Sequence, residues 1–267
     1  MPETSPHPPE KAEPSPVEVR CYFVRGRNAL AVRADFGPIY MDHYLHLMQH
    51  GIHLPPAHDR MLRDAFAALT LHLASRPWKE TIAWTANFQE PALNLFVTGS
   101  SLAGYVTGRV FTENVKESEQ ALLYSQTSVK NESPRQSIIA LEGTDLLAVA
   151  ESFYLQSEQR PARFFHYAPE DLVFISAQPD CDLQWLDSLD DDAIQRLDQD
   201  EELSLLETRS YRLDCGCSLD RLVPALASLS SSDYDALFAG KDASSALDIT
   251  CPRCAATFHV TRDQLRR

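Results

Sequence analysis

Residues 215–217 read Cys-Gly-Cys, and residues 251–254 read Cys-Pro-Arg-Cys. A C-x-x-C turn brings two sulfurs to one side of a tight knuckle, and the two cysteines of a C-x-C motif face the same way in extended chain. Gly216 leaves the backbone free to bend between its two cysteines. We therefore expect Cys215, Cys217, Cys251 and Cys254 to form one all-sulfur site for a tetrahedral zinc ion.

The predicted zinc shell has no open position, so it is structural or redox-active and not hydrolytic. The module around it, residues 211–267, is small, and structural zinc contributes about 10–16 kcal/mol of apparent folding free energy. Because oxidants attack thiolates, oxidation of such a site is linked to unfolding of the module. Two short helices are expected between the cysteine pairs and a last helix after Thr261. His259 is an alternative ligand.

The other two cysteines stand apart from this cluster. Cys21 lies in a predicted strand and is interpreted as a small buried apolar residue. Cys181 lies between Asp180 and Asp182, whose charges should raise the pKa of its thiol, so we interpret it as a bystander. A thiol at this position could still form an extra disulfide once its segment unfolds.

Composition excludes several classes of function. The chain has 267 residues, 44% of them hydrophobic, and a formal net charge of −14. Such an acidic chain lacks the clustered Lys and Arg that a nucleic-acid groove needs. No apolar run approaches the roughly 20 residues that span a bilayer, and the proline-rich residues 1–16 do not resemble a signal peptide. We expect a disordered tail at 1–16, no nucleic-acid or membrane partner, and a cytoplasmic protein with reduced thiols.

Between the tail and the cysteines, the patterns predict a mixed α+β core. Two short strands are expected over 17–32, helices over 38–50 and 57–75, and another helix over 144–159. Residues 80–139 alternate apolar and polar side chains between turn residues, which is typical of an antiparallel sheet. Residues 172–177 could add one more strand.

Residues 180–207 are strongly acidic, with eleven Asp and Glu and a single arginine, Arg196, among regularly spaced leucines. One interpretation is a solvated amphipathic helix. The other is a marginal segment, in which like charges repel and order depends on docking of the apolar face.

Five histidines, His43, His46, His50, His53 and His58, are close together in the sequence. Positions 43, 46 and 50 share a helical face, so a metal or a pH-sensing role is conceivable. With no carboxylate or cysteine partner evident nearby, we favour a solvated helix face.

The cysteine spacing at the C-terminus resembles that of the 33 kDa chaperonin family of redox-regulated heat-shock holdases. Residues 139–144, IALEGT, and residues 151–163, ESFYLQSEQRPAR, are similar to a second segment of that family. The stretch that leads into the first cysteine pair, IQRLDQDEELSLLETRSYRLDCGC, is similar as well. The likeness covers residues 138–267, and it implies a divergent member with a shortened linker.

This resemblance implies that the four thiolates hold zinc in the reduced, inactive chaperone. Strong oxidants would form the disulfides Cys215–Cys217 and Cys251–Cys254 and release the metal. The zinc domain and linker would then unfold, and exposed apolar surface would capture unfolding client proteins without ATP. The active form would be a homodimer, and the protein would not be an enzyme.

We therefore predict an α+β core at 17–177, an acidic helical linker at 178–210, and a zinc-binding redox-switch domain at 211–267. Two rival functions stay open. A static zinc-ribbon interaction module would keep its metal on oxidation. A dithiol oxidoreductase using Cys251 and Cys254 would turn over disulfides without zinc, although no thioredoxin-like βαβ pattern surrounds the pair.

Overall fold

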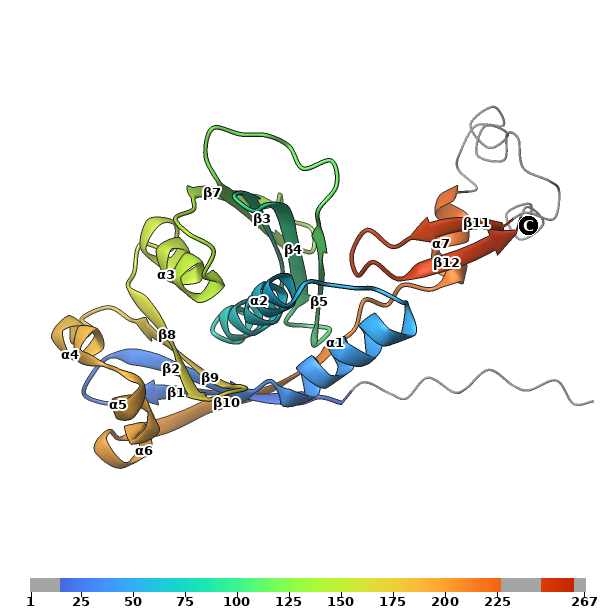
Figure 1. Ribbon diagram of the computed structural model, residues 1–267. Helices are drawn as coiled ribbons and strands as arrows, with labels where there is room; N and C mark the ends of the chain where they lie inside the picture. The colour runs from blue at the N-terminus through green and yellow to red at the C-terminus, as the bar shows by residue number, and fades with distance from the viewer. Residues whose placement is uncertain (1–14, 227–245, 262–267) are drawn as a thin grey trace, which may run out of the picture.

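The computed structural model of the chain describes residues 15–226 and 246–261 (Figure 1). Most of the expected tail at 1–16, the second helix expected between the cysteine pairs and the helix expected after Thr261 lie outside these residues. The predicted α+β class is confirmed. In chain order, the elements are β1 (Val17–Val24), β2 (Ala29–Asp35), α1 (Gly37–Gln49), α2 (Pro56–Ala74), β3 (Glu80–Gln89), β4 (Ala92–Ser100), β5 (Tyr105–Phe111), β6 (Leu122–Val129), β7 (Arg135–Ala140), α3 (Leu146–Gln156), β8 (Ala162–Ala168), β9 (Asp171–Ala177), α4 (Leu183–Ser188), α5 (Asp191–Gln195), α6 (Leu197–Asp200), β10 (Leu203–Leu213), α7 (Leu219–Leu226), β11 (Ala246–Thr250) and β12 (Thr257–Thr261).

Ten strands form one sheet in the order β7-β6-β3-β4-β5-β10-β1-β2-β9-β8. The antiparallel sheet expected over 80–139 is strands β3 to β7, and the strand expected at 172–177 is β9. Strand β10 joins the two halves of the sheet, because it pairs antiparallel with β1 and parallel with β5. The contact with β5 is short: Arg212 pairs with Tyr105, and Leu213 with Val106.

Helix α2 lies in the concave space between the two halves of the sheet (Figure 1). Its last ten residues, AFAALTLHLA, are buried on every side, which explains why this stretch is largely apolar all round and not amphipathic. The small alanines let the helix approach strands β4 and β5, while the leucines fill the core. This helix therefore fixes the two halves of the sheet relative to each other.

The expected acidic helical linker is only partly helical. Residues 183–200 form the short helices α4, α5 and α6, but residues 203–210, which we expected in the linker, belong to strand β10. The helical interpretation is wrong for Leu203, Leu205 and Leu206, which lie in this strand. Leu205 and Leu206 are 57% and 56% exposed, while the buried side chains of this strand are Arg209 and Tyr211. Pairing with β1 and β5 decides the local structure, as tertiary context often does for ambiguous sequences.

The three short helices cover one face of the outer strands. Their apolar side chains, Trp185, Leu186, Leu189, Ile194 and Leu197, are buried against a second core separate from the main one. The sheet side of this second core is made by residues of β1, β2, β8 and β9. Asp182 and Asp190 cap α4 and α5 by accepting hydrogen bonds from Trp185 N and Ala193 N. The docked-segment interpretation of the acidic stretch thus agrees with this packing.

Two arginines, one in a turn between strands and one in a strand, bind the acidic helical segment. Arg27, in the turn between β1 and β2, binds Asp182 at one end of the helical segment and Glu201 at the other, at 2.8 and 2.9 Å. Arg163 of β8 donates to the backbone carbonyls of Leu186 and Leu189, where the exposed end of α4 carries partial negative charge. Asp182 and Glu201 therefore share one cationic partner, and Arg163 binds the backbone of the helical segment.

The second core leads to a prediction about the linker. Leu186 is fully buried, whereas Leu183, in the same helix, is 47% exposed. Leu186→Ala should destabilise the docked segment by about 2–5 kcal/mol, because a buried leucine loses both contacts and transfer free energy. Limited proteolysis of the reduced protein should then cut faster within 178–202. Leu183→Ala is the matched control, and equal cleavage of the two variants would contradict the packing described.

A second prediction concerns His72 in α2, which is 1% exposed and lies 2.6 Å from the Tyr154 hydroxyl through Nδ1. Burial lowers the pKa of His72 well below its ordinary value, and the charges of Arg76 and Arg160 lower it further. The folded protein therefore keeps His72 neutral while the unfolded chain protonates it below about pH 6.5. Stability should be complete above that pH and should fall as the pH drops toward the folded-state pKa.

In urea unfolding between pH 7.5 and 5, His72 should account for a loss of up to about 1.4 kcal/mol per pH unit. The variant His72→Gln should lose stability at all pH values but show a shallower decline than the wild type. The exposed His53, changed to Gln, should keep the wild-type slope. A slope unchanged in His72→Gln would contradict the assignment.

Candidate metal centre

The first cysteine pair follows directly on strand β10. The backbone N–H of Asp214 still donates to Val106 of β5, at 3.1 Å, so the strand pairing fixes where the pair begins. Gly216 then has a φ of +61°, a conformation that favours glycine, and its N–H donates to the Asp214 side chain at 2.7 Å. This turn directs Cys215 and Cys217 toward the second pair.

The second pair lies in the knuckle (residues 251–256) that joins β11 to β12. Cys251 N–H donates to the Ala256 carbonyl at 2.8 Å, and Ala255 N–H donates to the Cys251 carbonyl at 3.1 Å. The backbone N–H of Arg253 lies 3.5 Å from the Cys251 sulfur. Cys251 and Cys254 are both buried at the turn, so their sulfurs face the first pair and not solvent.

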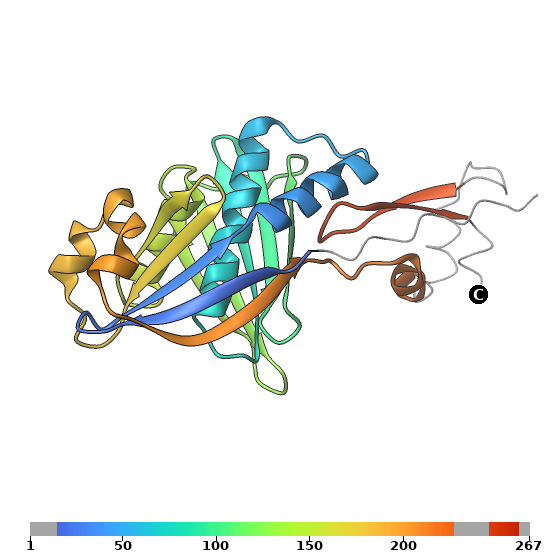
Figure 2. The ribbon, with the colours of Figure 1, turned by 90° about the horizontal axis from the view of Figure 1, so that it is seen from below.

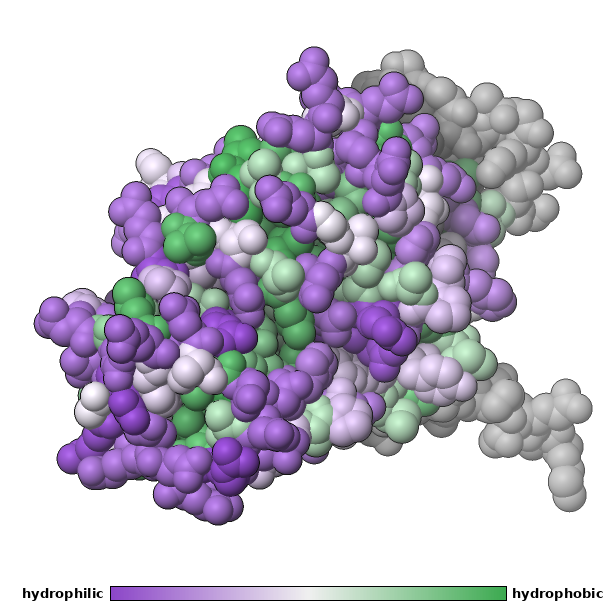
Figure 3. All heavy atoms as spheres, turned by 60° about the vertical axis from the view of Figure 1, so that its left-hand side comes forward, coloured by the Kyte–Doolittle hydropathy of each residue, from purple (hydrophilic) through white to green (hydrophobic). Residues whose placement is uncertain are grey.

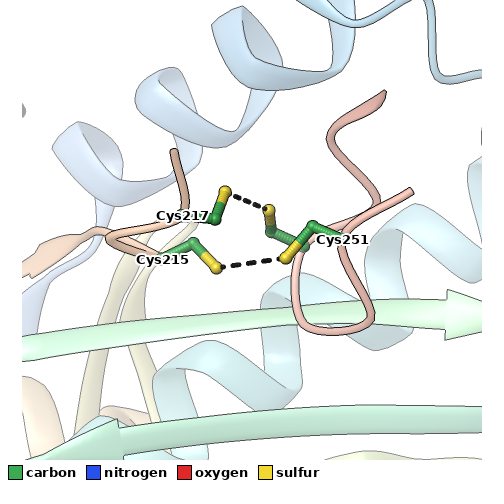
Figure 4. Close-up of side chains that lie close together, drawn as sticks. Cys215, Cys217 and Cys251 are labelled. Atoms are coloured by element: carbon green, nitrogen blue, oxygen red, sulfur yellow. Dashed lines mark hydrogen bonds between the residues drawn. The ribbon is translucent and has the colours of Figure 1, made fainter. Parts of the chain in front are cut away.

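The four sulfur atoms form one cluster, and all of them lie within 4.8 Å of one another. Cys215 Sγ is 3.6 Å from Cys251 Sγ, and Cys217 Sγ is 3.4 Å from Cys254 Sγ (Figure 4). A tetrahedral ion with Zn–S bonds of about 2.3 Å would hold its sulfurs about 3.8 Å apart. The predicted gathering of these four cysteines is therefore observed, and the donor set suits a soft tetrahedral metal ion.

The sulfurs affect one another's ionisation because they are so close. The thiol of Cys217 lowers the pKa of Cys215, while Cys215 in turn raises the pKa values of Cys217 and Cys254. One thiolate is thus favoured and its neighbours act as donors, since adjacent negative charges repel. A divalent cation at the centre removes this conflict and favours the thiolate form of all four.

Three cationic or histidine side chains bind the backbone of the cysteine segments, and of these the sequence analysis named only His46, as part of the histidine cluster. Arg109 of β5 donates to the Cys251 carbonyl at 2.9 Å, and His46 of α1 donates to the Cys254 carbonyl at 2.8 Å. Arg253, within the knuckle, donates to the Cys215 carbonyl and to the Tyr105 hydroxyl of β5. Partners so far apart in sequence share no local pattern. The burial of Gly108 and Val110 on either side of Arg109 is a feature of the fold, so no signal in the local sequence marked this arginine.

The interpretation of the histidine cluster as a solvated helix face is wrong in part. His43 is 3% exposed and its Nε2 lies 3.0 Å from Asp59 of α2, a carboxylate partner that sequence distance had concealed. The imidazoles of His46 and His50 lie 4.8 Å apart, and His46 is half-buried beside the knuckle. The helix face thus packs on α2 and the knuckle at these positions.

The remaining candidates lie outside the sulfur cluster. Cys21 is buried in β1, as expected, and its pKa is raised to about 11, chiefly by burial. The pKa of Cys181 is also raised, by burial first and by Asp182 to a lesser degree. His259 is exposed on β12 and pairs with Asp248 of β11, so its side chain does not join the four sulfurs.

Comparison with known proteins points to one family. The family model for Hsp33 protein matches residues 175–261, which include both cysteine pairs. A curated 33 kDa chaperonin of Edwardsiella ictaluri (strain 93-146) is 28% identical over 152 residues, or 48% of this chain and 51% of the relative. The chain thus spans about half the length of the curated relative in that match.

The fold has a close counterpart among solved structures. The crystal structure of a 33 kDa chaperonin, a heat shock protein 33 homologue from Thermotoga maritima, matches with a TM-score of 0.71. The match covers 93% of this chain and 96% of that one, and at 12% identity it establishes the fold. In the described part of the chain, no helix has the length and apolar character needed to cross a membrane. The chain is thus similar to the Hsp33, or 33 kDa chaperonin, family in its C-terminal sequence, and it shares the fold of a member of that family.

Proposed function

We propose that this protein is a redox-regulated, ATP-independent chaperone, whose Cys215, Cys217, Cys251 and Cys254 hold zinc when reduced. The observation that carries the proposal is the four-sulfur cluster, whose first cysteine pair directly follows strand β10. When bound, zinc would tie the two cysteine segments together and neutralise thiolate charge. The chain's own residues perform the remaining steps.

The redox step uses a peroxide as the oxidant. Cys251 and Cys254 give two electrons to one peroxide molecule, which takes up two protons and leaves as two waters, while a disulfide forms between the two sulfurs. Cys215 and Cys217 do the same with a second peroxide. Each pair would thereby lose the thiolates that could hold a metal ion, and the two cysteine segments would no longer be held to each other.

Separation of the two cysteine segments would affect the linker directly, because the first segment and the linker are joined by strand β10. Cys215 follows β10 by two residues, and β10 follows the helices that cover the second core. If these helices detach, the apolar sheet face beneath them becomes exposed, together with Trp185, Leu186 and Ile194 of the helices themselves. Figure 3 shows that the side carrying these helices now presents mostly hydrophilic residues, with apolar ones in the recesses. The buried apolar surface would be the client-binding surface.

The expected partners follow from this arrangement. Unfolding client proteins expose apolar segments, which exposed apolar surface binds without a nucleotide. The net charge of −14 would keep the activated protein soluble while that surface is exposed. We further propose that the oxidised form is a homodimer and that the protein acts in the cytoplasm, where the resting thiols stay reduced. The domain boundaries at 16, 177 and 210 remain predictions.

The proposal predicts that peroxide activates the protein. Reduced, zinc-loaded protein and peroxide-treated protein are mixed with thermally unfolding citrate synthase without ATP, and light scattering reports aggregation. The oxidised form should suppress aggregation at near-equimolar ratio, the reduced form should not, and a thiol reductant should reverse the effect. Zinc release, followed with a chromogenic chelator, should accompany activation. Release of zinc without any suppression would leave a static zinc module as the better description.

Metal binding itself is tested with matched cysteine variants. Cys254→Ser should lower zinc affinity by orders of magnitude, because one of four thiolate ligands is lost. Cys181→Ser, which changes a cysteine outside the cluster, should bind one zinc per chain like the wild type. Cobalt substitution should give the strong absorption of tetrahedral thiolate coordination in the wild type and in Cys181→Ser. Wild-type protein that binds no zinc would overturn the proposed switch.

A further inference from the structure

We infer that Arg109 and His46, two residues of the main core, are positioning residues of the metal centre. The inference rests on the proposed zinc site and goes beyond it. If it holds, the metal site is not a self-contained C-terminal module, because its second cysteine pair is held in place by the large sheet and by helix α1.

The first support is geometric. Arg109 Nη1 binds the Cys251 carbonyl at 2.9 Å, and His46 Nε2 binds the Cys254 carbonyl at 2.8 Å. Both cysteines of the knuckle thus accept hydrogen bonds from the core through their carbonyl oxygens. Because groups that orient metal ligands from outside the ligand set also tune affinity, these two contacts are placed to act on the metal.

The second support is the packing between knuckle and core. Cys254 and Ala255 line one small cavity together with His43, His46 and Leu47 of α1 and with Gly108 and Arg109 of β5, and its volume is only about 20 Å³. That is close to the space of one water molecule. Elsewhere α7, β11 and β12 extend away from the large sheet (Figure 2). The knuckle is therefore where this hairpin meets the core.

The third support is charge. Four thiolates around one divalent cation leave a net charge of −2, which nearby cations stabilise. Arg109 is half-buried over the ring of Phe111, at 4.1 Å. Burial lowers the pKa of Arg109, and the neighbouring Cys251 and Cys254 sulfurs oppose that shift by favouring its charged form. Arg253 supplies a second cation and also binds Tyr105 of β5 at 3.1 Å. Strand β5 thus contributes both a hydrogen bond and a positive charge to the thiolate cluster.

The test compares arginine variants of the full chain. Arg109→Gln removes the charge, Arg109→Lys keeps it, and Arg20→Gln changes an exposed arginine on β1 whose salt bridge is to Glu18. Zinc affinity is measured on reduced protein by competition with a chelator. We expect Arg109→Gln to bind zinc about 10–100-fold more weakly, Arg109→Lys to recover most of that loss, and Arg20→Gln to match the wild type. His46→Ala should lower affinity in the same direction.

A measurement of sheet stability distinguishes the loss of a positioning contact from general destabilisation of the fold. Urea unfolding followed by tryptophan fluorescence should be similar in all four variants and the wild type. Arg109→Gln protein that binds zinc as tightly as the wild type would overturn the inference and leave the proposed switch intact. Weaker binding that merely follows loss of sheet stability, without rescue by lysine, would also overturn it. Wild-type protein without zinc affinity would overturn both.

Discussion

The short parallel contact between β5 and β10 sets the position of everything that follows it. Two residue pairs, Arg212 with Tyr105 and Leu213 with Val106, close the ten-stranded sheet at its centre. The first cysteine pair begins immediately beyond that contact, and β5 also presents Tyr105 and Arg109 to the knuckle. A parallel pairing of this length is weak by itself, so the packing of α2 on both halves is needed to maintain it.

The acidic segment and the cysteine cluster are therefore not independent attachments to a finished domain. Strand β10 is both the end of the acidic segment and an interior strand of the sheet, with β1 on one side and β5 on the other. Detachment of α4 to α6 leaves that strand paired, whereas detachment of β10 divides the sheet. The proposed switch can thus expose the second core in a local opening that leaves the main core folded.

The sequence predicted the cysteine cluster, the α+β class and the positions of α1 and α2, because these depend on local spacing and periodicity. It could not predict β10 as a central strand, since the acidic leucine-bearing stretch fits a helix until its neighbours are known. The partners His43 with Asp59 and Arg109 with Cys251 were equally hidden. Their side chains meet only after the chain has folded, and nothing in local sequence marks a contact between distant residues.

Arg27 has a consequence for how the acidic segment leaves and returns. One guanidinium binds Asp182 and Glu201, so the residues between them form a loop closed by a single side chain. When one carboxylate dissociates from Arg27, the other stays bound to the same guanidinium. Rebinding of the first then costs only the chain entropy of closing a short loop. Detachment from one end is thus readily undone, and lasting opening requires both ends to be free at once. Arg27 therefore favours the return of a detached acidic segment to its original position on the sheet.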